Sequence, residues 1–192
     1  MNFESLHRLT FDLLYACLAL LTFVIAERSF FFGYLGMRAQ KIAAALRAPG
    51  FDPAAWRAGG GDVLNRSVAE YIGFQLAGGT ARPKIEDLSS ALFLEVDGKV
   101  QARLWILDTV VTAAPLLGLL GTVLGIMDTF TSLAQSGISD PAAVSRGIGT
   151  ALIATAIGIA TALYGLVGHS VLNRQAVNLI EMFKSFMLRT TL

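Results

Sequence analysis

The sequence predicts an all-α membrane protein with three transmembrane helices and a helical cytoplasmic segment, in which long helices extend into the cytoplasm. Of its 192 residues, 54% are hydrophobic and only 15% are charged, whereas a soluble domain has about 45–50% apolar and about 25% charged residues. The charged residues are clumped, which leaves three long apolar runs. The net charge of +1 gives no electrostatic reason to expect nucleic-acid binding.

The first predicted unit, residues 1–35, combines a periplasmic N-terminus with the first transmembrane helix. Its apolar run, Leu13–Ala26, is short for a span of about 20 residues. Aromatic residues follow the charged pair Glu27 and Arg28 and can extend the span to the interface. The alternative, a cleaved signal peptide, needs a basic start and a small-residue cleavage site, but the chain starts MNFE.

The next two spans are predicted at residues 104–133 and 147–172, and a C-terminal cytoplasmic helix at 173–192. Both runs are long enough to cross a membrane with some tilt. Only a short polar stretch, the predicted periplasmic turn 134–146, joins them. We therefore expect an antiparallel hairpin of two spans lying side by side.

Basic residues predict the orientation of the chain. Twelve of the fifteen lysines and arginines lie between the first two spans or after the third. The positive-inside rule places these segments in the cytoplasm and the N-terminus in the periplasm.

The cytoplasmic segment, residues 36–103, reads as a helical scaffold. Met37–Leu46 looks like a continuation of the first span, Asp62 is a plausible N-cap of a helix to about Leu76, and Pro83 suits the first turn of another. Because no strong breaker except Gly98 follows, we expect that last helix to run straight into the second span.

Neither an enzyme nor a cofactor is predicted. The segment has no Walker lysine and no Gly-x-Gly-x-x-Gly motif. The single cysteine, Cys17, excludes an internal disulfide, and its surroundings offer no metal site. No functional role is assigned to His7, which is terminal and outside, or to His169, which is expected at the inner interface.

Small residues form one face of each hairpin helix. Ala114, Gly118, Gly121 and Gly125 follow one another at spacings of four, three and four, and Gly158 belongs to a similar face of the third span. Small residues at this spacing let helix backbones approach closely inside a membrane. These glycines, together with Pro115, are interpreted as helix-packing residues.

A second face of the hairpin is polar. Thr112 and Thr122 share a stripe of the second span with Asp108, and Thr150 and Thr155 add hydroxyls from the third. A threonine hydroxyl can hydrogen-bond to a carbonyl of its own helix, so burial of any single threonine has a low free-energy cost. Together they suggest the wall of an ion pathway, with Glu27, Arg28 and Asp108 as interface charges. No carboxylate lies at mid-span, so a proton carrier would come from another subunit.

At this point the sequence resembles the MotA/TolQ/ExbB proton channel family, and its span order fits the ExbB/TolQ-like branch. The matching motifs are APLLGLLGTV at 114–123 followed by GIM at 125–127, DP at 140–141, GI at 147–148, ALIATA at 151–156 and glycine at 158. Thr155 and Thr122 match the threonines of the family's pore. Glu27 and Arg28 resemble the charged pair after the family's first span.

The resemblance implies a molecular motor of the bacterial cell inner membrane that couples ion transport to protein transport or other work on the envelope. It implies a homopentamer in lipid, whose second and third spans surround two single-span helices of an ExbD/TolR-like partner. A TonB/TolA-like protein is a further candidate partner. The partner would carry the proton-binding aspartate.

Three positions depart from the family pattern. Ala113 and Thr150 stand where threonine and glutamate are usual, and Tyr164 replaces a proline. These changes leave both proton and sodium open as the ion. Three alternatives also stay open: a membrane scaffold without ion conduction, an independent small transporter, and a flagellar-stator-like subunit.

Overall fold

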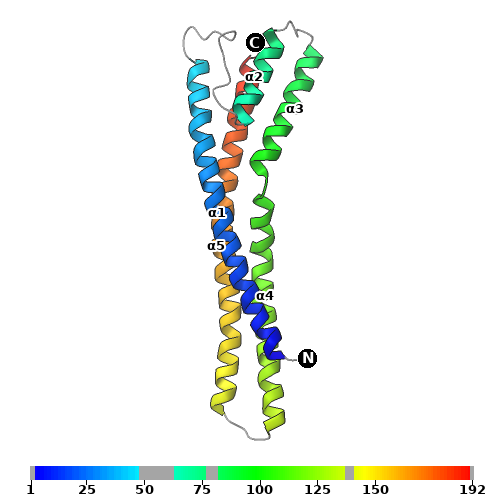
Figure 1. Cartoon of the computed structure of the whole chain (residues 1–192), viewed down its shortest axis with the longest axis vertical. Helices are drawn as coiled ribbons and strands as arrows, with labels where there is room; N and C mark the ends of the chain where they lie inside the picture. The colour runs from blue at the N-terminus through cyan, green and yellow to red at the C-terminus, as the bar shows by residue number, and fades with distance from the viewer. Residues whose placement is uncertain (1–2, 48–62, 77–81, 137–140, 191–192) are drawn as a thin grey trace. The chain divides into compact units, whose positions relative to one another are not determined.

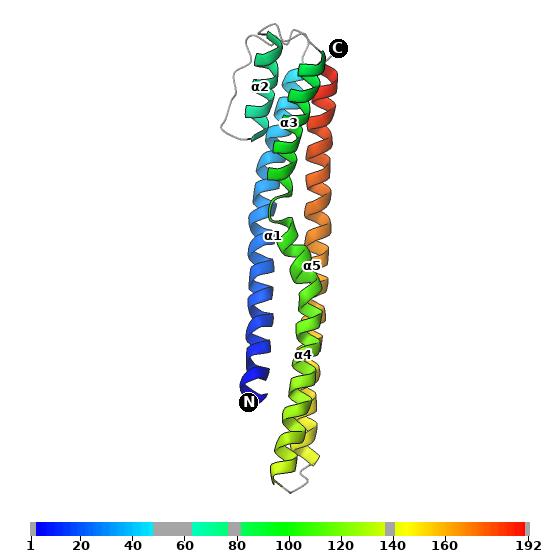
Figure 2. The same cartoon turned by 90° about the vertical axis from the view of Figure 1, so that its right-hand side faces the viewer.

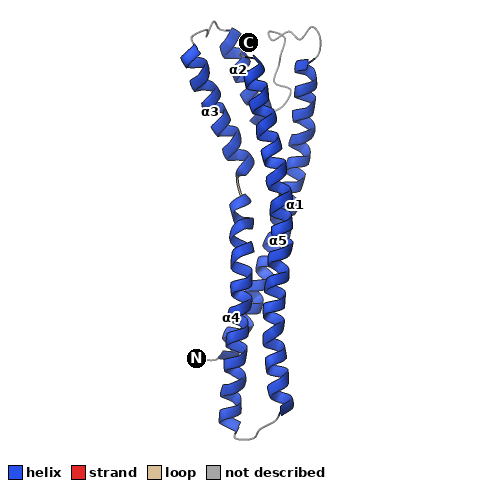
Figure 3. Ribbon diagram, turned by 180° about the vertical axis from the view of Figure 1, so that it is seen from behind, coloured by secondary structure: helices blue, strands red, loops and turns tan. Residues whose placement is uncertain are grey.

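The computed structural model describes residues 3–47, 63–76, 82–136 and 141–190, and these ranges contain helices and no strand (Figures 1 and 3). The helices are α1 (Phe3–Arg47), α2 (Val63–Leu76), α3 (Arg82–Gln101), α4 (Leu104–Ser136) and α5 (Pro141–Thr190). The all-α prediction is therefore confirmed. The expected N-cap at Asp62 lies outside the described residues.

Three of the helices are long and apolar enough to cross a membrane. The candidate spans are Ser5–Ala44, Leu104–Gln135 and Pro141–Ser185. Large apolar side chains on them remain exposed, among them Phe23, Leu116 and Val167. Since lipid tails are the natural environment of such side chains, this confirms the prediction of a multi-pass membrane protein.

The chain divides into two compact units, which are described separately. The span unit contains Met1–Ala26 and Arg103–Ser170, and the extension unit contains Glu27–Ala102 and Val171–Leu192. The span unit thus holds the first part of α1, all of α4 and the first part of α5. The extension unit holds the remainder of α1 and α5 together with α2 and α3.

In the span unit, α4 and α5 run antiparallel and α1 packs against both (Figures 1 and 2). Leu21 of α1 is fully buried, and its Cδ1 lies 3.0 Å from the position that a Cβ on Gly165 would take. Val111 of α4 approaches the same position to 2.8 Å. Gly165 therefore makes room for a side chain from each of the two other helices.

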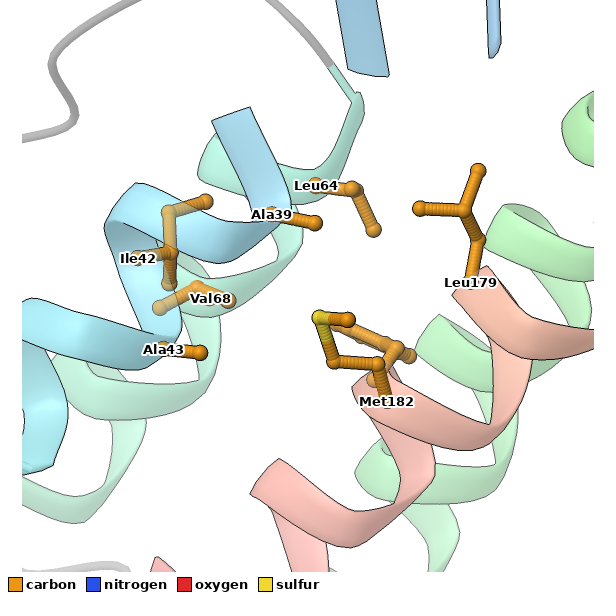
Figure 4. Close-up of a pocket in the computed structure, with 8 residues that line it drawn as sticks. Ala39, Ile42, Ala43, Leu64, Val68, Leu179 and Met182 are labelled. Carbon is orange, nitrogen blue, oxygen red and sulfur yellow. The ribbon is translucent and has the colours of Figure 1, made fainter. Parts of the chain in front are cut away.

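The extension unit has an apolar core of its own. A cavity of about 40 Å³ lies between α1, α2 and α5 (Figure 4). Its lining is entirely apolar: Ala39, Ile42, Ala43, Leu64, Val68, Leu179, Met182 and Phe183. Apolar side chains from three helices meet here, so hydrophobic packing contributes to this contact.

An ion-pair network joins α2 to α3. Glu95 accepts a hydrogen bond from Lys99 Nζ at 2.9 Å and pairs with the guanidinium of Arg66. The hydrogen bond from Lys99 and the positive charges of both partners outweigh desolvation and lower the pKa of the Glu95 carboxyl. The network is exposed, so its effect is modest.

The expectation of one straight helix through residues 84–133 is wrong. α3 ends at Gln101 and α4 begins at Leu104. Between them Arg103 has φ of 68°, a left-handed conformation that no α-helix can continue through. The backbone N–H of Ile106 donates to the Arg103 carbonyl at 3.1 Å, which starts the next helix. Arg103, and not Gly98, is the breaking residue.

The hairpin helices reach into the stretch that the sequence suggested as a turn. α4 continues to Ser136, and α5 begins at Pro141. Proline suits the first position of a helix because its missing N–H would have no partner there. α5 then runs without a break to Thr190.

Candidate functional site

The candidate site is built on a backbone-to-backbone contact between α4 and α5. A Cβ placed on Gly158 would lie 2.6 Å from the carbonyl oxygen of Ala114 and 3.0 Å from Cα of Gly118. A Cβ on Gly118 would lie 2.9 Å from the carbonyl oxygen of Ala154. No side chain larger than hydrogen fits at either position, so the two glycines set the distance between the helices.

Further small residues continue this contact along the hairpin. Cβ atoms on Gly121 and Gly125 would lie 2.8 Å and 2.9 Å from the methyl groups of Ala154 and Ala151. Farther along, Gly147 receives the side chain of Thr129. The contact thus extends over several turns of both helices.

Pro115 lies inside α4, beside the closest approach of the helices. Because proline has no N–H, the carbonyl of Val111 lacks its usual donor within the helix. The helix nevertheless continues through Pro115 to Ser136. Pro115 is half-buried, and the preceding residue, Ala114, is fully buried.

Two threonine hydroxyls meet where the helices are closest. The hydroxyl groups of Thr122 on α4 and Thr155 on α5 are hydrogen-bonded to each other. Thr155 Oγ1 also donates to the carbonyl of Gly118 at 3.1 Å, and Thr122 Oγ1 lies 3.1 Å from the carbonyl of Ala151. The pair therefore links both helices through side chains and backbone. We call Thr122 and Thr155 the hydroxyl pair.

The hydroxyl pair has a restricted chemistry. A threonine hydroxyl can donate one hydrogen bond and accept two, and it stays neutral at physiological pH. It can replace water around a passing cation, but it cannot hold a proton as a charge. Among the described residues, no group of three or more His, Cys, Asp or Glu side chains is arranged to hold a metal ion.

The other two predicted pathway threonines lie apart from the hydroxyl pair. Thr112 Oγ1 donates to carbonyls of its own helix, those of Asp108 and Thr109, at 3.1 Å and 2.9 Å. Thr150 Oγ1 donates to the carbonyl of Arg146 at 2.9 Å, again within one helix. Both side chains are exposed in this chain, as is Asp108.

The charged pair after the first span belongs to the extension unit. Arg28 is buried, with 5% of its surface exposed, and its guanidinium lies 5.1 Å from the centre of the Phe31 ring. This distance is suitable for a cation–π interaction. Glu27 is half-buried.

Two residues of α1 that the sequence reasoning left without a role contact the glycine face of α4. His7 Nδ1 lies 3.1 Å from the carbonyl oxygen of Gly121. Thr10 is 2% exposed, and its Oγ1 lies 3.1 Å from the position of a Cβ on Gly121. Helical spacing was the available signal, because His7, Thr10 and Leu14 fall on one face of the helix.

Comparison with known proteins covers the hairpin and most of the extension unit. The chain matches the MotA/TolQ/ExbB proton channel family over residues 61–185. It is 35% identical over 108 residues to the biopolymer transport protein ExbB of Aquifex aeolicus, which covers 56% of this chain and 72% of that protein.

Two further relatives match over shorter stretches. The chain is 40% identical over 82 residues to a putative ExbB homolog of Methanothermobacter thermautotrophicus, covering 43% of this chain and 29% of that protein. It is 39% identical over 88 residues to the Tol-Pal system protein TolQ of Pseudomonas aeruginosa, covering 46% and 38%. The chain therefore spans well under half the length of these two relatives.

The family match contains both threonines of the hydroxyl pair and the glycines that bring them together. With three helices able to cross a membrane and relatives named ExbB and TolQ, this is a multi-pass protein of the inner membrane. By its sequence and by the hairpin that the sequence builds, the chain belongs to the MotA/TolQ/ExbB proton channel family, on its ExbB/TolQ-like branch.

Proposed function

We propose that this chain is the pore-forming subunit of an inner-membrane motor driven by the proton-motive force. The observation that carries the proposal is the hydroxyl pair, in which Thr122 and Thr155 hydrogen-bond across the closest approach of α4 and α5. A membrane scaffold would need the glycine contact alone. Paired hydroxyls add oxygen ligands for a cation at the same place.

The proposed complex is a homopentamer around the membrane helices of an ExbD/TolR-like dimer. Its support is the relation to proteins named for biopolymer transport and for the Tol-Pal system. A neutral hydroxyl pair leaves the charge-carrying step to another group, and an aspartate on the partner supplies it. A TonB/TolA-like protein would transmit the work to the outer membrane.

In this proposal the N-terminus is periplasmic, and the extension unit and C-terminus are cytoplasmic. Thr112 and Thr150 extend the pathway beyond the hydroxyl pair, since their exposed side chains are free to face the partner. The exposure of Thr112 and Thr150 and the neutral, paired hydroxyls of Thr122 and Thr155 support a guiding role for this chain and a carrying role for the partner.

Proton flux into liposomes tests the proposal. The full chain is co-purified with a single-span partner that has a membrane aspartate, and a pH-sensitive dye is enclosed in the vesicles. Thr155→Val removes one hydroxyl at nearly constant volume. Thr22→Val is the matched control, because the exposed Thr22 hydroxyl bonds only the Leu18 carbonyl of its own helix, at 2.8 Å.

We expect flux only with the partner present, reduced by Thr155→Val and unchanged by Thr22→Val. Loss of one well-placed polar ligand is expected to lower flux roughly tenfold, the rate equivalent of about 1.4 kcal/mol. Equal flux in both variants would refute the pore role of Thr155. Proton flux without any partner would instead identify an independent transporter. Absence of flux in the presence of the partner would identify a scaffold.

A further inference from the structure

The first turns of α1 pack on α4, where a side chain of α1 contacts the backbone of α4. His7 Nδ1 lies 3.1 Å from the carbonyl oxygen of Gly121. The ring of Phe11, one turn later, meets the imidazole edge to face with 5.1 Å between ring centres. The residues of α1 lie outside the part of the chain that matches the family, residues 61–185.

Two glycines of α4 make the space for this contact. A Cβ on Gly125 would lie 2.9 Å from His7 Cε1, and a Cβ on Gly121 would lie 3.1 Å from Thr10 Oγ1. We call Gly121 and Gly125 the glycine notch. The same glycines face Ala154 and Ala151 of α5, so side chains from both α1 and α5 reach the notch.

The hydrogen bond determines which ring nitrogen has the proton. A carbonyl oxygen can only accept, so Nδ1 of His7 must donate. The nearby Thr10 hydroxyl donates its one hydrogen to the backbone carbonyl of His7 at 2.6 Å, so it does not donate to a ring nitrogen. Neutral His7 is therefore the Nδ1–H tautomer, in which Nε2 has no proton.

Charged residues of both signs occur along the three helices within a few turns of this contact. The nearest charged residues along the three helices are Glu4, Arg8 and Asp12 on α1, Asp128 on α4 and Arg146 on α5. The Nδ1–H donor is present in neutral and in cationic imidazole alike. The contact with Gly121 therefore does not require His7 to be charged.

We propose that His7 is a positioning residue that latches the first turns of α1 onto the glycine notch as its Nδ1–H tautomer. Gly121 directly precedes Thr122 in α4, so the latch acts on the turn that holds one member of the hydroxyl pair. The hydrogen-bond partner of His7 is the Gly121 carbonyl and not a hydroxyl of the pair. Its effect on the pair passes through the backbone of α4.

Nitrogen-15 NMR of the His7 imidazole in the full-length chain tests the tautomer directly. The chain has two histidines, His7 and His169, so His169→Gln leaves one ring to observe in lipid nanodiscs. In its neutral form, His7 is expected to show a protonated Nδ1 and an unprotonated Nε2. The opposite pattern, with the proton on Nε2, would overturn the proposal.

A second measurement compares three substitutions of His7 that differ in where they place a hydrogen-bond donor. The amide nitrogen of His7→Asn stands where Nδ1 stands, the amide of His7→Gln reaches the position of Nε2, and His7→Phe keeps a ring without a donor. Backbone hydrogen exchange over residues 5–14 reports whether the first turns remain docked.

We expect His7→Asn to exchange at the wild-type rate, and His7→Gln and His7→Phe to exchange roughly threefold faster, as for one interhelical hydrogen bond in a membrane. Wild-type protection in His7→Phe would overturn the latch. If His7→Asn exchanges as fast as His7→Phe, or His7→Gln as slowly as His7→Asn, the assignment of Nδ1 as the donor is wrong. Neither readout depends on ion flow, so the result is independent of the proposed function.

Discussion

Substitution of Gly158 by alanine tests whether the closest approach of α4 and α5 holds the hairpin together. The new Cβ would lie 2.6 Å from the Ala114 carbonyl oxygen, about 0.8 Å inside the 3.4 Å at which ordinary van der Waals contact begins. The opposing atoms belong to backbone, which cannot rotate away as a side chain can. The helices must therefore move apart at this level.

The expected cost follows from that displacement. Overpacking of a well-packed interior costs about 1–3 kcal/mol. Separation also stretches the hydrogen bond from Thr155 to the Gly118 carbonyl, now 3.1 Å, and such interhelical bonds average about 0.6 kcal/mol. Because separation relieves overpacking, the two costs overlap, and we expect a net loss of about 1–3 kcal/mol from the contact.

Gly149→Ala is the matched control. It makes the same change in the same helix, and a Cβ there meets nothing within 4 Å. Both variants gain about 1 kcal/mol of helix propensity, which cancels in the comparison. Unfolding of the purified chain by SDS in mixed micelles, followed by circular dichroism, gives the difference. If Gly158→Ala is as stable as Gly149→Ala, the close backbone contact does not hold the hairpin.

Two further predictions concern the extension unit and the helix break. The lowered pKa of Glu95 means that its ion pairs stabilise the fold above the carboxyl's ordinary pKa and lose that effect as the pH falls through the folded-state value. The melting temperature of Glu95→Gln should therefore be below that of wild type at neutral pH and equal to it in acid. An equal difference in melting temperature at both pH values would contradict this. At Arg103, valine should be about 1–2 kcal/mol less stable than glycine, because a β-branched residue tolerates a left-handed φ poorly. Chemical unfolding of Arg103→Val and Arg103→Gly, which both lose the arginine side chain, measures this, and equal stability would argue against strain at Arg103.

Periodicity and composition were sufficient to predict the helices and the small-residue face. Gly118 and Gly158 show why: a spacing pattern of small residues has few purposes inside a membrane, so sequence alone indicates close packing. The break before α4 was not predictable in the same way. Its left-handed residue is arginine, and turn signals in sequence depend on glycine or asparagine at such positions.

The candidate site was predicted in outline only. Thr112 and Thr122 share a helical stripe, but only Thr122 lies opposite a hydroxyl on α5, and that depends on how the two helices are placed along each other. His7 was set aside because it is near the terminus. Its partner is a backbone carbonyl, and a backbone acceptor leaves no mark in a sequence.

The hydroxyl pair also has a consequence for how the site can respond to a charge. Thr122 and Thr155 have two hydroxyl hydrogens between them but make four short contacts, with each other and with the carbonyls of Gly118 and Ala151. More than one arrangement of the hydrogens therefore suits the same positions of carbon and oxygen. Rotation about two C–O bonds reverses the local dipole, on the fast timescale of side-chain torsions and with no movement of the backbone. Where the backbones of α4 and α5 approach each other closely, the site can thus reorient its hydroxyl dipoles around a passing charge without moving the helices.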